Sequence, residues 1–320
     1  MIGWPLPPDP DDGDAESGVP GKGVPREVLR QVRLIELRTR GLVDNVFGGE
    51  YQSVFRGQGI EFAEVREYQP GDDIRTIDWN VTARMGQPFV KQYVEERELT
   101  LLLVVDLSGS EQFGTRTRFK AELAAEIGAV IALSAASNND RTGLLIFTDR
   151  VEHSVPPKKG RRHALRLIRD VLAFRPQGRG TDLAGALDYA GRVLPHRAIV
   201  FVLSDFHIPA EDEPQFDRTL RVVSRRHDVV AVKISDPREL ELPDAGLLRL
   251  RDPETGEVRV VDTGSREVRQ RFRATAIARD AAMRRRFRRL GVDEIEVATD
   301  RPYAPPLLEF FERRARAARR

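Results

Sequence analysis

The sequence contains no cysteine, and this absence excludes disulfide bonds, thiol catalysis and cysteine-based zinc sites. It fits a reducing compartment. The sequence also has no apolar run near the roughly 20 residues that a membrane-spanning helix needs. Its first residues, MIGWPLPPDP, lack the basic and apolar regions of a secretory signal. We therefore expect a cytoplasmic protein.

The motifs of several common enzyme classes are missing as well. The segment GVPGKG at 18–23 has neither the spacing nor the strand–helix context of a phosphate-binding loop. There is no G-x-S-x-G nucleophile elbow, and the five histidines show no H-E-x-x-H pairing. We therefore expect a protein without catalytic residues.

What is present is an ordinary globular composition with an uneven distribution of charge. Hydrophobic residues make up 40% and charged residues 32%, and the net charge is only +2. Residues 266–320, however, carry 16 Arg and no Lys against 8 Asp and Glu. This excess predicts either a patch for nucleic acid or an acidic partner, or a solvated helix face. The lack of interleaved aromatic residues and of any nucleic-acid motif favours the helix face.

The N-terminal third divides into two parts. Residues 1–25 are rich in Pro, Gly and Asp and predict a disordered tail. Residues 26–98 combine a helix that ends near Phe47 with a segment of strand-like alternation from Ile60, which we expect to pack on the main domain and to bury Phe62 and Trp79.

Residues 99–320 alternate between strands and helices and predict the main domain. The expected strands are 99–106, 142–149, 151–155, 198–205, 228–235 and 293–299, and the expected helices are 118–137, 161–172, 182–193, 213–226, 266–290 and the C-terminal segment. This alternation predicts an α/β fold with a doubly wound, mostly parallel six-stranded sheet of order 3-2-1-4-5-6 and an antiparallel third strand at its edge. Residues 247–262 read as an inserted β-hairpin.

Ligands in such sheets bind where the strand order reverses, at the carboxyl ends of the first and fourth strands. The first strand ends in Asp106-Leu107-Ser108-Gly109-Ser110 and the fourth in Ser204-Asp205, while Thr181 precedes a helix. Two carboxylates and three hydroxyls are hard oxygen ligands suited to Mg²⁺. Alternatively, Asp106 and the serines simply cap the following helix, although the threonine and the second aspartate in the expected order favour the metal site.

These residues resemble the metal-ion-dependent adhesion site of von Willebrand factor type A domains. The matching positions are Asp106, Ser108, Ser110, Thr181 and Asp205. The resemblance implies that the three hydroxyls bind Mg²⁺ or Mn²⁺ directly, and that the two aspartates do so directly or through water.

A second resemblance is more specific. The segment FRGQGIEFAEVREYQPGDDIRTIDWNVTARMGQPFVKQYVEERE is similar to the signature of the bacterial family numbered 58 among domains of unknown function. Together with the A-domain motifs, it covers roughly residues 45–310. Many relatives carry transmembrane helices, and the family is associated with AAA+ ATPases of the MoxR type. The resemblance therefore implies an adaptor or chaperone-like component.

The signature contains a charged cluster made of Arg66, Asp72, Asp73, Arg75 and Asp78. We interpret it as salt bridges and turn caps that fix the segment onto the main domain, with Trp79 buried beneath. The alternative is an acid–base pair.

These observations predict a metal-dependent protein-binding module. We expect its partner, a MoxR-type AAA+ ATPase, to supply an acidic side chain. The first alternative is a Mg²⁺-dependent phosphoester hydrolase with Asp106 as its nucleophile. The second is nucleic-acid binding through the Arg-rich C-terminus, which we expect to be the weaker of the two.

Overall fold

The computed structural model describes residues 25–46, 61–94, 98–112 and 119–318. Its central element is a six-stranded sheet with the strand order β10-β7-β6-β3-β4-β5. The strands are β3 (Thr100–Asp106), β4 (Arg141–Phe147), β5 (Val151–Lys159), β6 (Ile199–Ser204), β7 (Asp228–Ser235) and β10 (Asp293–Ala298). All neighbours are parallel except β4 and β5. The predicted fold class, strand order and antiparallel edge strand are confirmed.

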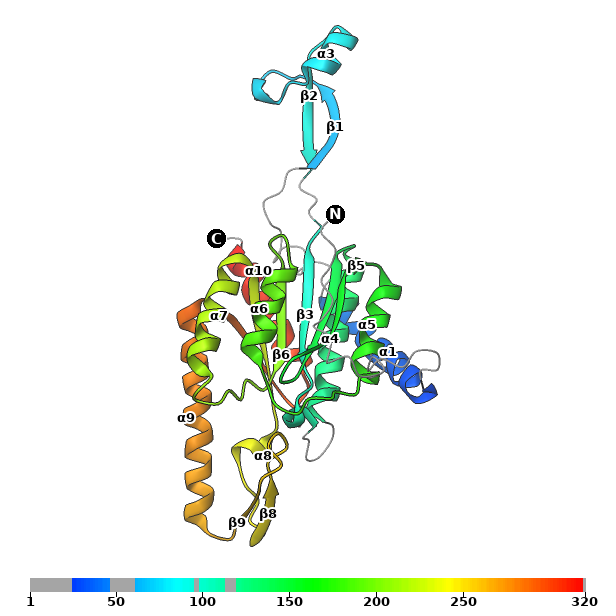
Figure 1. The fold of residues 1–320 in the computed structure, drawn as a ribbon. Helices are drawn as coiled ribbons and strands as arrows, with labels where there is room; N and C mark the ends of the chain where they lie inside the picture. The colour runs from blue at the N-terminus through cyan, green and yellow to red at the C-terminus, as the bar shows by residue number, and fades with distance from the viewer. Residues whose placement is uncertain (1–24, 47–60, 95–97, 113–118, 319–320) are drawn as a thin grey trace, which may run out of the picture.

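Helices cover both faces of this sheet (Figure 1). One face packs against α4 (Lys120–Ser137), α5 (Arg161–Ala173) and α10 (Ala304–Ala318), and α1 (Arg26–Val46) packs on α4 and α5. The other face packs against α6 (Leu183–Val193), α7 (Glu213–Arg226) and α9 (Arg266–Leu290). The result is a three-layer arrangement in which both faces of the sheet are buried.

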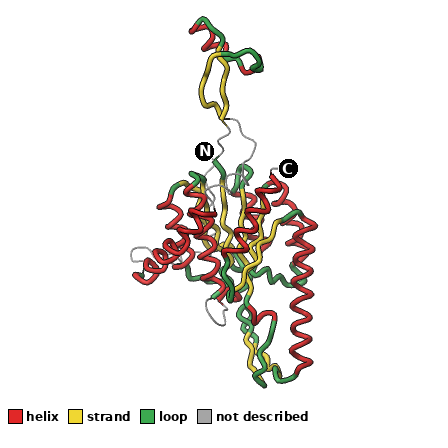
Figure 2. The backbone as a smooth tube through the Cα atoms, turned by 180° about the vertical axis from the view of Figure 1, so that it is seen from behind, coloured by secondary structure: helices red, strands yellow, loops and turns green. Residues whose placement is uncertain are grey.

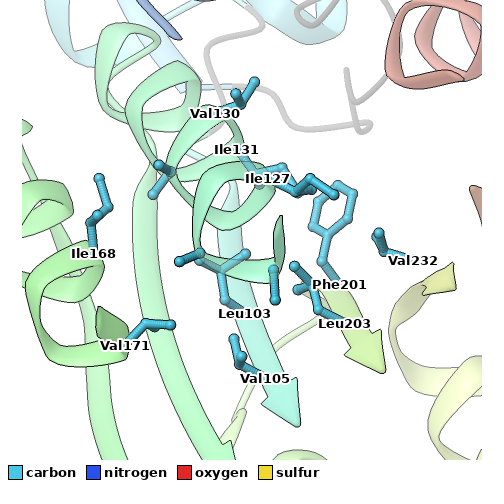
Figure 3. Close-up of a cluster of buried hydrophobic side chains, with 14 of the residues drawn as sticks. Leu103, Val105, Ile127, Val130, Ile131, Ile168, Val171, Phe201, Leu203 and Val232 are labelled. Carbon is cyan, nitrogen blue, oxygen red and sulfur yellow. The ribbon is translucent and has the colours of Figure 1, made fainter. Parts of the chain in front are cut away.

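Strand β3 shows why the sequence selects this arrangement. Its side chains alternate between the two faces, so Leu103 and Val105 belong to the core under α4, whereas Leu102 and Val104 belong to the core under α6. Figure 3 shows Leu103 and Val105 of β3 in the same cluster of buried side chains as Ile127 of α4. Burying each such side chain contributes about 1.5–3 kcal/mol. An apolar residue at every position is therefore what a central strand of a doubly covered sheet requires.

The segment between α1 and the sheet differs from our expectation. Strands β1 (Glu61–Glu67) and β2 (Phe89–Val94) pair antiparallel, and between them lie the 3-10 helix η1 (Ile74–Thr76) and the short helix α3 (Trp79–Met85). We call residues 61–94 the signature module. Figures 1 and 2 both show it beyond the end of the central sheet, away from the helical layers.

The prediction that Trp79 is buried is wrong, because its side chain is 67% exposed. A single two-stranded hairpin has no second layer that could cover an indole ring. Among the described residues before β3, α1 packs on the body through Val32, Ile35 and Val43. The side chain of Phe62 lies outside the described residues, and so does the predicted tail 1–25 apart from Pro25.

The predicted insertion forms a hairpin of β8 (Leu247–Arg251) and β9 (Val258–Asp262), which follows the short helix α8 (Pro237–Leu240). Figure 1 shows the hairpin at the end of the sheet opposite the signature module. Among the described residues, no helix is both long and apolar enough to cross a membrane.

Candidate metal site

Two buried carboxylates meet where the strand order of the sheet reverses. Strands β3 and β6 are parallel neighbours, with Val105 opposite Leu203, so their carboxyl ends lie side by side. Asp106 ends β3 and Asp205 follows β6. Their carboxylate oxygens and that of Glu111 all lie within 4.8 Å of one another, and all three residues are buried. The expected gathering of polar residues at this point is confirmed for the two aspartates.

Local hydrogen bonds hold Asp106 and the following loop in place. One carboxylate oxygen, Oδ1, accepts the backbone N–H of Ser108 at 2.9 Å. The other, Oδ2, accepts the hydroxyl of Ser204 at 2.7 Å. The hydroxyls of Ser108 and Ser110 are 3.1 Å apart. The loop therefore turns both serine hydroxyls inward beside the aspartate.

The buried carboxylate of Asp106 is poorly placed to act as a nucleophile. Both of its oxygens already accept hydrogen bonds, and the residue has no exposed surface.

The loop that carries Thr181 lies against the Asp106–Ser110 loop. The carbonyl of Arg179 accepts the N–H of Gly109 at 2.8 Å, and Asp182 caps α6 by accepting the N–H of Gly185 at 2.8 Å. The hydroxyl of Thr181 donates to Glu254 Oε1 at 2.8 Å. The structure thus places Thr181 next to the serine loop, with its hydroxyl on a carboxylate of the inserted hairpin.

The sequence analysis missed a buried ammonium group beside Asp205. The Nζ atom of Lys120 lies 2.6 Å from Asp205 Oδ2 and 2.6 Å from Glu239 Oε1, and the lysine side chain is fully buried. No local pattern could have revealed Lys120, because its partners are distant in sequence. Glu111 was missed too, although its position directly after Ser110 was a usable signal.

The site holds more carboxyl groups than its basic groups can neutralise. Burial and the neighbouring Asp205 raise the pKa of Asp106 to about 7. Burial also raises the pKa of Glu111 well above its ordinary value, against the attraction of Lys120. Burial alone would raise the pKa of Asp205, but His207 and Lys120 lower it. Among Asp106, Glu111, Asp205, Glu239 and Lys120, four carboxylates face one ammonium group.

The residues present fit a bound cation. The Oε2 atom of Glu111 is buried without a hydrogen-bond partner among the described residues, while Oε1 accepts the N–H of Asp205 at 3.0 Å. Carboxylates and hydroxyls are the ligands that hard divalent cations prefer. This buried acidic cluster could therefore hold a metal ion.

The backbone after Asp205 is unusual. Phe206 is a bulky residue with a φ of 55°, and its ring is buried edge-on against Phe287 at 5.1 Å between centroids. A left-handed conformation is costly for such a residue and persists only where the surroundings enforce it. The turn lets the N–H of His207 donate to Asp205 Oδ1 at 2.9 Å, which fixes the carboxylate toward the site.

The charged cluster of the signature module has a structural role, as we interpreted it. The guanidinium group of Arg66 donates two hydrogen bonds to the carboxylate of Asp72, from Nη1 to Oδ2 at 2.8 Å and from Nη2 to Oδ1 at 2.7 Å. Asp73 caps η1, and Asp78 caps α3 by accepting the N–H groups of Asn80 and Val81. The salt bridge and both caps are confirmed, but these contacts all lie within the module, so they do not fix it onto the main domain as we expected.

Many arginines of the C-terminal region face carboxylates of other elements. Arg286 contacts Glu213 and Asp217, and Arg314 lies 2.6 Å from Asp228 and 2.7 Å from Asp293. These ion pairs neutralise part of the local excess. They also tie α9 and α10 to neighbouring elements, beyond the solvated helix face that we expected.

Comparisons with known proteins give a consistent assignment. The model of the family described as "Protein of unknown function DUF58" matches residues 64–282. The uncharacterized protein Rv1480 of Mycobacterium tuberculosis is 36% identical over 289 residues, which cover 90% of each chain. The uncharacterized protein YeaD of Bacillus subtilis is 29% identical over 107 residues, 33% of this chain and 25% of that protein.

Solved structures with distant similarity include a conserved hypothetical protein, BatB, from Bacteroides thetaiotaomicron. It is 15% identical with a TM-score of 0.46 and covers 68% of this chain and 99% of that chain. A von Willebrand factor type A protein from Catenulispora acidiphila is 12% identical with a TM-score of 0.37. The match covers 72% of this chain and 44% of that protein. The order and directions of the strands, rather than these distant similarities, define the fold.

Proposed function

The chain belongs to the DUF58 family, and from this premise we propose that it is a metal-dependent protein-binding module that acts as an adaptor. It would have no catalytic activity of its own and would work in the cytoplasm. The observation that carries the proposal is the convergence of two buried aspartates and two serine hydroxyls at the reversal point of the sheet.

The metal ion would be Mg²⁺ or Mn²⁺. Its ligands would be Asp106, Ser108, Ser110, Thr181 and Asp205, since these residues supply only oxygen atoms and lie on the three adjoining loops of the site. Such a cation attracts an additional acidic ligand and strengthens its binding in a desolvated interface.

A cavity of about 750 Å³ beside the site supports the approach of a partner. Its lining includes Ser110 of the serine loop, the basic residues Arg238 and Arg279, and the apolar residues Leu242 and Phe272. Positive charge and apolar surface next to a cation suit a protein segment that carries a carboxylate. The family resemblance points to a AAA+ ATPase of the MoxR type as that partner.

Isothermal titration of the full chain with Mn²⁺ and Mg²⁺ tests the metal site. We expect the wild type to bind one ion and Asp106→Ala to bind none, because the substitution removes a buried ligand. The matched control is Asp188→Ala, since the carboxylate of Asp188 is 59% exposed and pairs only with the helix neighbour Arg192. Equal binding by wild type and Asp106→Ala would refute the assignment.

Binding of a purified MoxR-type ATPase, measured with immobilised chain, tests the adaptor role. EDTA and Ser108→Ala should weaken the same complex. Glu296→Ala on the edge strand β10 should leave it unchanged. A complex that is indifferent to both EDTA and Ser108→Ala would show that the metal does not mediate recognition.

A further inference from the structure

The tip of the inserted hairpin is a preformed loop. The N–H of Asp252 donates to the carbonyl of Glu257 at 2.8 Å, and the N–H of Gly256 donates to the carbonyl of Asp252 at 2.9 Å. The carboxylate of Asp252 also accepts the N–H groups of Glu254 at 2.9 Å and Thr255 at 3.0 Å. The tip therefore holds its shape through its own hydrogen bonds, and the side chain of Glu254 projects from a fixed backbone.

The carboxylate of Glu254 lies on the metal site itself. Its Oε1 atom accepts the hydroxyl of Thr181 at 2.8 Å, and the side chain of Ser110 interacts with the same carboxyl group and acts to lower its pKa, against the effect of burial. Thr181 and Ser110 come from two different loops, and both belong to the proposed ligand set. One carboxylate of the hairpin thus bridges two of the hydroxyl ligands.

The backbone of the tip also fits closely against the serine loop. A Cβ atom placed on Gly109 would lie 2.5 Å from the carbonyl oxygen of Pro253 and 2.9 Å from its carbonyl carbon. Contacts this short do not occur with real side chains. The tip can occupy this position only because position 109 has no side chain.

The two strands behind the tip are weakly held. None of the residues in β8 or β9 is buried, and Leu247 and Val260 are 73% and 65% exposed. The base is fixed by the buried Thr263, whose hydroxyl donates to the carbonyl of Gly246 at 2.7 Å. The hairpin is therefore hydrogen-bonded at its base, exposed along both strands and in contact with the metal site at its tip.

We propose that Glu254 is an in-chain carboxylate ligand of the metal site, which an acidic side chain of the partner must displace. The inference rests on the proposed function. A glutamate of the hairpin and a carboxylate of a partner offer the same chemical group, and both cannot occupy the surface formed by Ser110 and Thr181. The hairpin would thus raise metal affinity in the free protein and restrict binding to partners that compete well.

The substitution Glu254→Gln tests this role with little change in shape, because the amide oxygen can still accept the hydroxyl of Thr181. The control is Glu257→Gln on the same hairpin, since Glu257 is exposed and pairs with Arg259. In titrations of the full chain with Mn²⁺, we expect Glu254→Gln to lower the affinity at least about tenfold, because even the loss of a residue that only supports a metal ligand costs about 10–100-fold. Glu257→Gln should bind Mn²⁺ as the wild type does.

Amide hydrogen exchange at residues 252–257 gives an independent readout. Adding Mn²⁺ should slow exchange at the tip in the wild type and in Glu257→Gln, but not in Glu254→Gln. If Glu254→Gln matches the wild type in both affinity and exchange, the hairpin inference is overturned while the metal site stands. If the wild type binds no Mn²⁺ at all, the proposed function and the hairpin inference both fall.

Discussion

At the scale of single residues, Lys120 is the group on which the buried carboxylates depend most. It is the only ammonium within contact distance of Asp205 and Glu239 among the described residues. A buried ion pair that loses one partner leaves an uncompensated charge, at a cost of about 3–5 kcal/mol. We therefore expect Lys120→Met to lower the free energy of unfolding by about that amount in EDTA. Guanidinium unfolding measured by circular dichroism checks this value.

The same variant should recover part of its stability in Mn²⁺, because a bound cation supplies positive charge to the same carboxylates. Lys159→Met is the matched control, since Lys159 pairs with the half-exposed Glu98 at the surface. Such surface pairs contribute only about 0–1 kcal/mol. A Lys120→Met protein as stable as the wild type in EDTA would contradict the electrostatic account of the site.

Glu294 on β10 predicts a pH dependence of stability that is separate from the metal site. Burial and the neighbouring Glu296 raise its pKa to about 7, against about 4.3 in an unfolded chain. The folded protein therefore binds this proton more tightly than the unfolded chain. Its stability falls as the pH rises from about 4.3 to 7, and the penalty is complete above that range.

Glu294→Gln removes this penalty. Compared with the wild type, we expect a gain of about 1 kcal/mol at pH 8, a value reduced for the partial hydration of the carboxylate, and little or none at pH 4. Melting temperatures of both proteins at the two pH values measure the difference. Glu267→Gln, at a site that is 81% exposed, is the control. The same difference at both pH values would show that Glu294 is already ionised without cost.

At the scale of elements, the fold could be predicted because the central strands are buried and therefore almost entirely apolar. Strands β3 and β6 are apolar at nearly every position and buried throughout except at Thr100, a pattern that surface strands do not show. The two central strands also end in Asp106 and Ser204-Asp205, and their parallel pairing alone brings the aspartates together. Short segments of sequence were thus sufficient to predict the fold and the proximity of Asp106 and Asp205.

The elements that the sequence did not reveal owe their structure to distant contacts. Strand β2 pairs with β1, from Glu67 opposite Phe89 to Glu61 opposite Val94, and its Val90 also forms a bridge with Ile77. Lys120 and Glu254 reach the site from α4 and from the hairpin tip, and neither lies near the aspartates in sequence. Their roles depend on tertiary packing, which periodicity does not encode.

At the scale of the whole molecule, the signature module and the body differ in how they are stabilised. The body has a continuous core on both faces of the sheet. The module is a two-stranded hairpin, and its large apolar residues Ile74, Trp79 and Met85 are 65%, 67% and 64% exposed to solvent. A hairpin of this kind is marginally stable by itself, and Figures 1 and 2 show it away from the body. We infer that the two parts open independently.

A matched pair of helix caps tests this independence. Asp78 caps α3 in the module and Asp182 caps α6 in the body, and loss of either cap costs about 1 kcal/mol locally. We expect Asp78→Ala to speed amide exchange at residues 79–94 and to leave the main melting transition unchanged. Asp182→Ala should lower that transition by a few degrees, because α6 is part of the core. If Asp78→Ala lowers the main transition as much as Asp182→Ala does, the module and the body unfold as one cooperative unit.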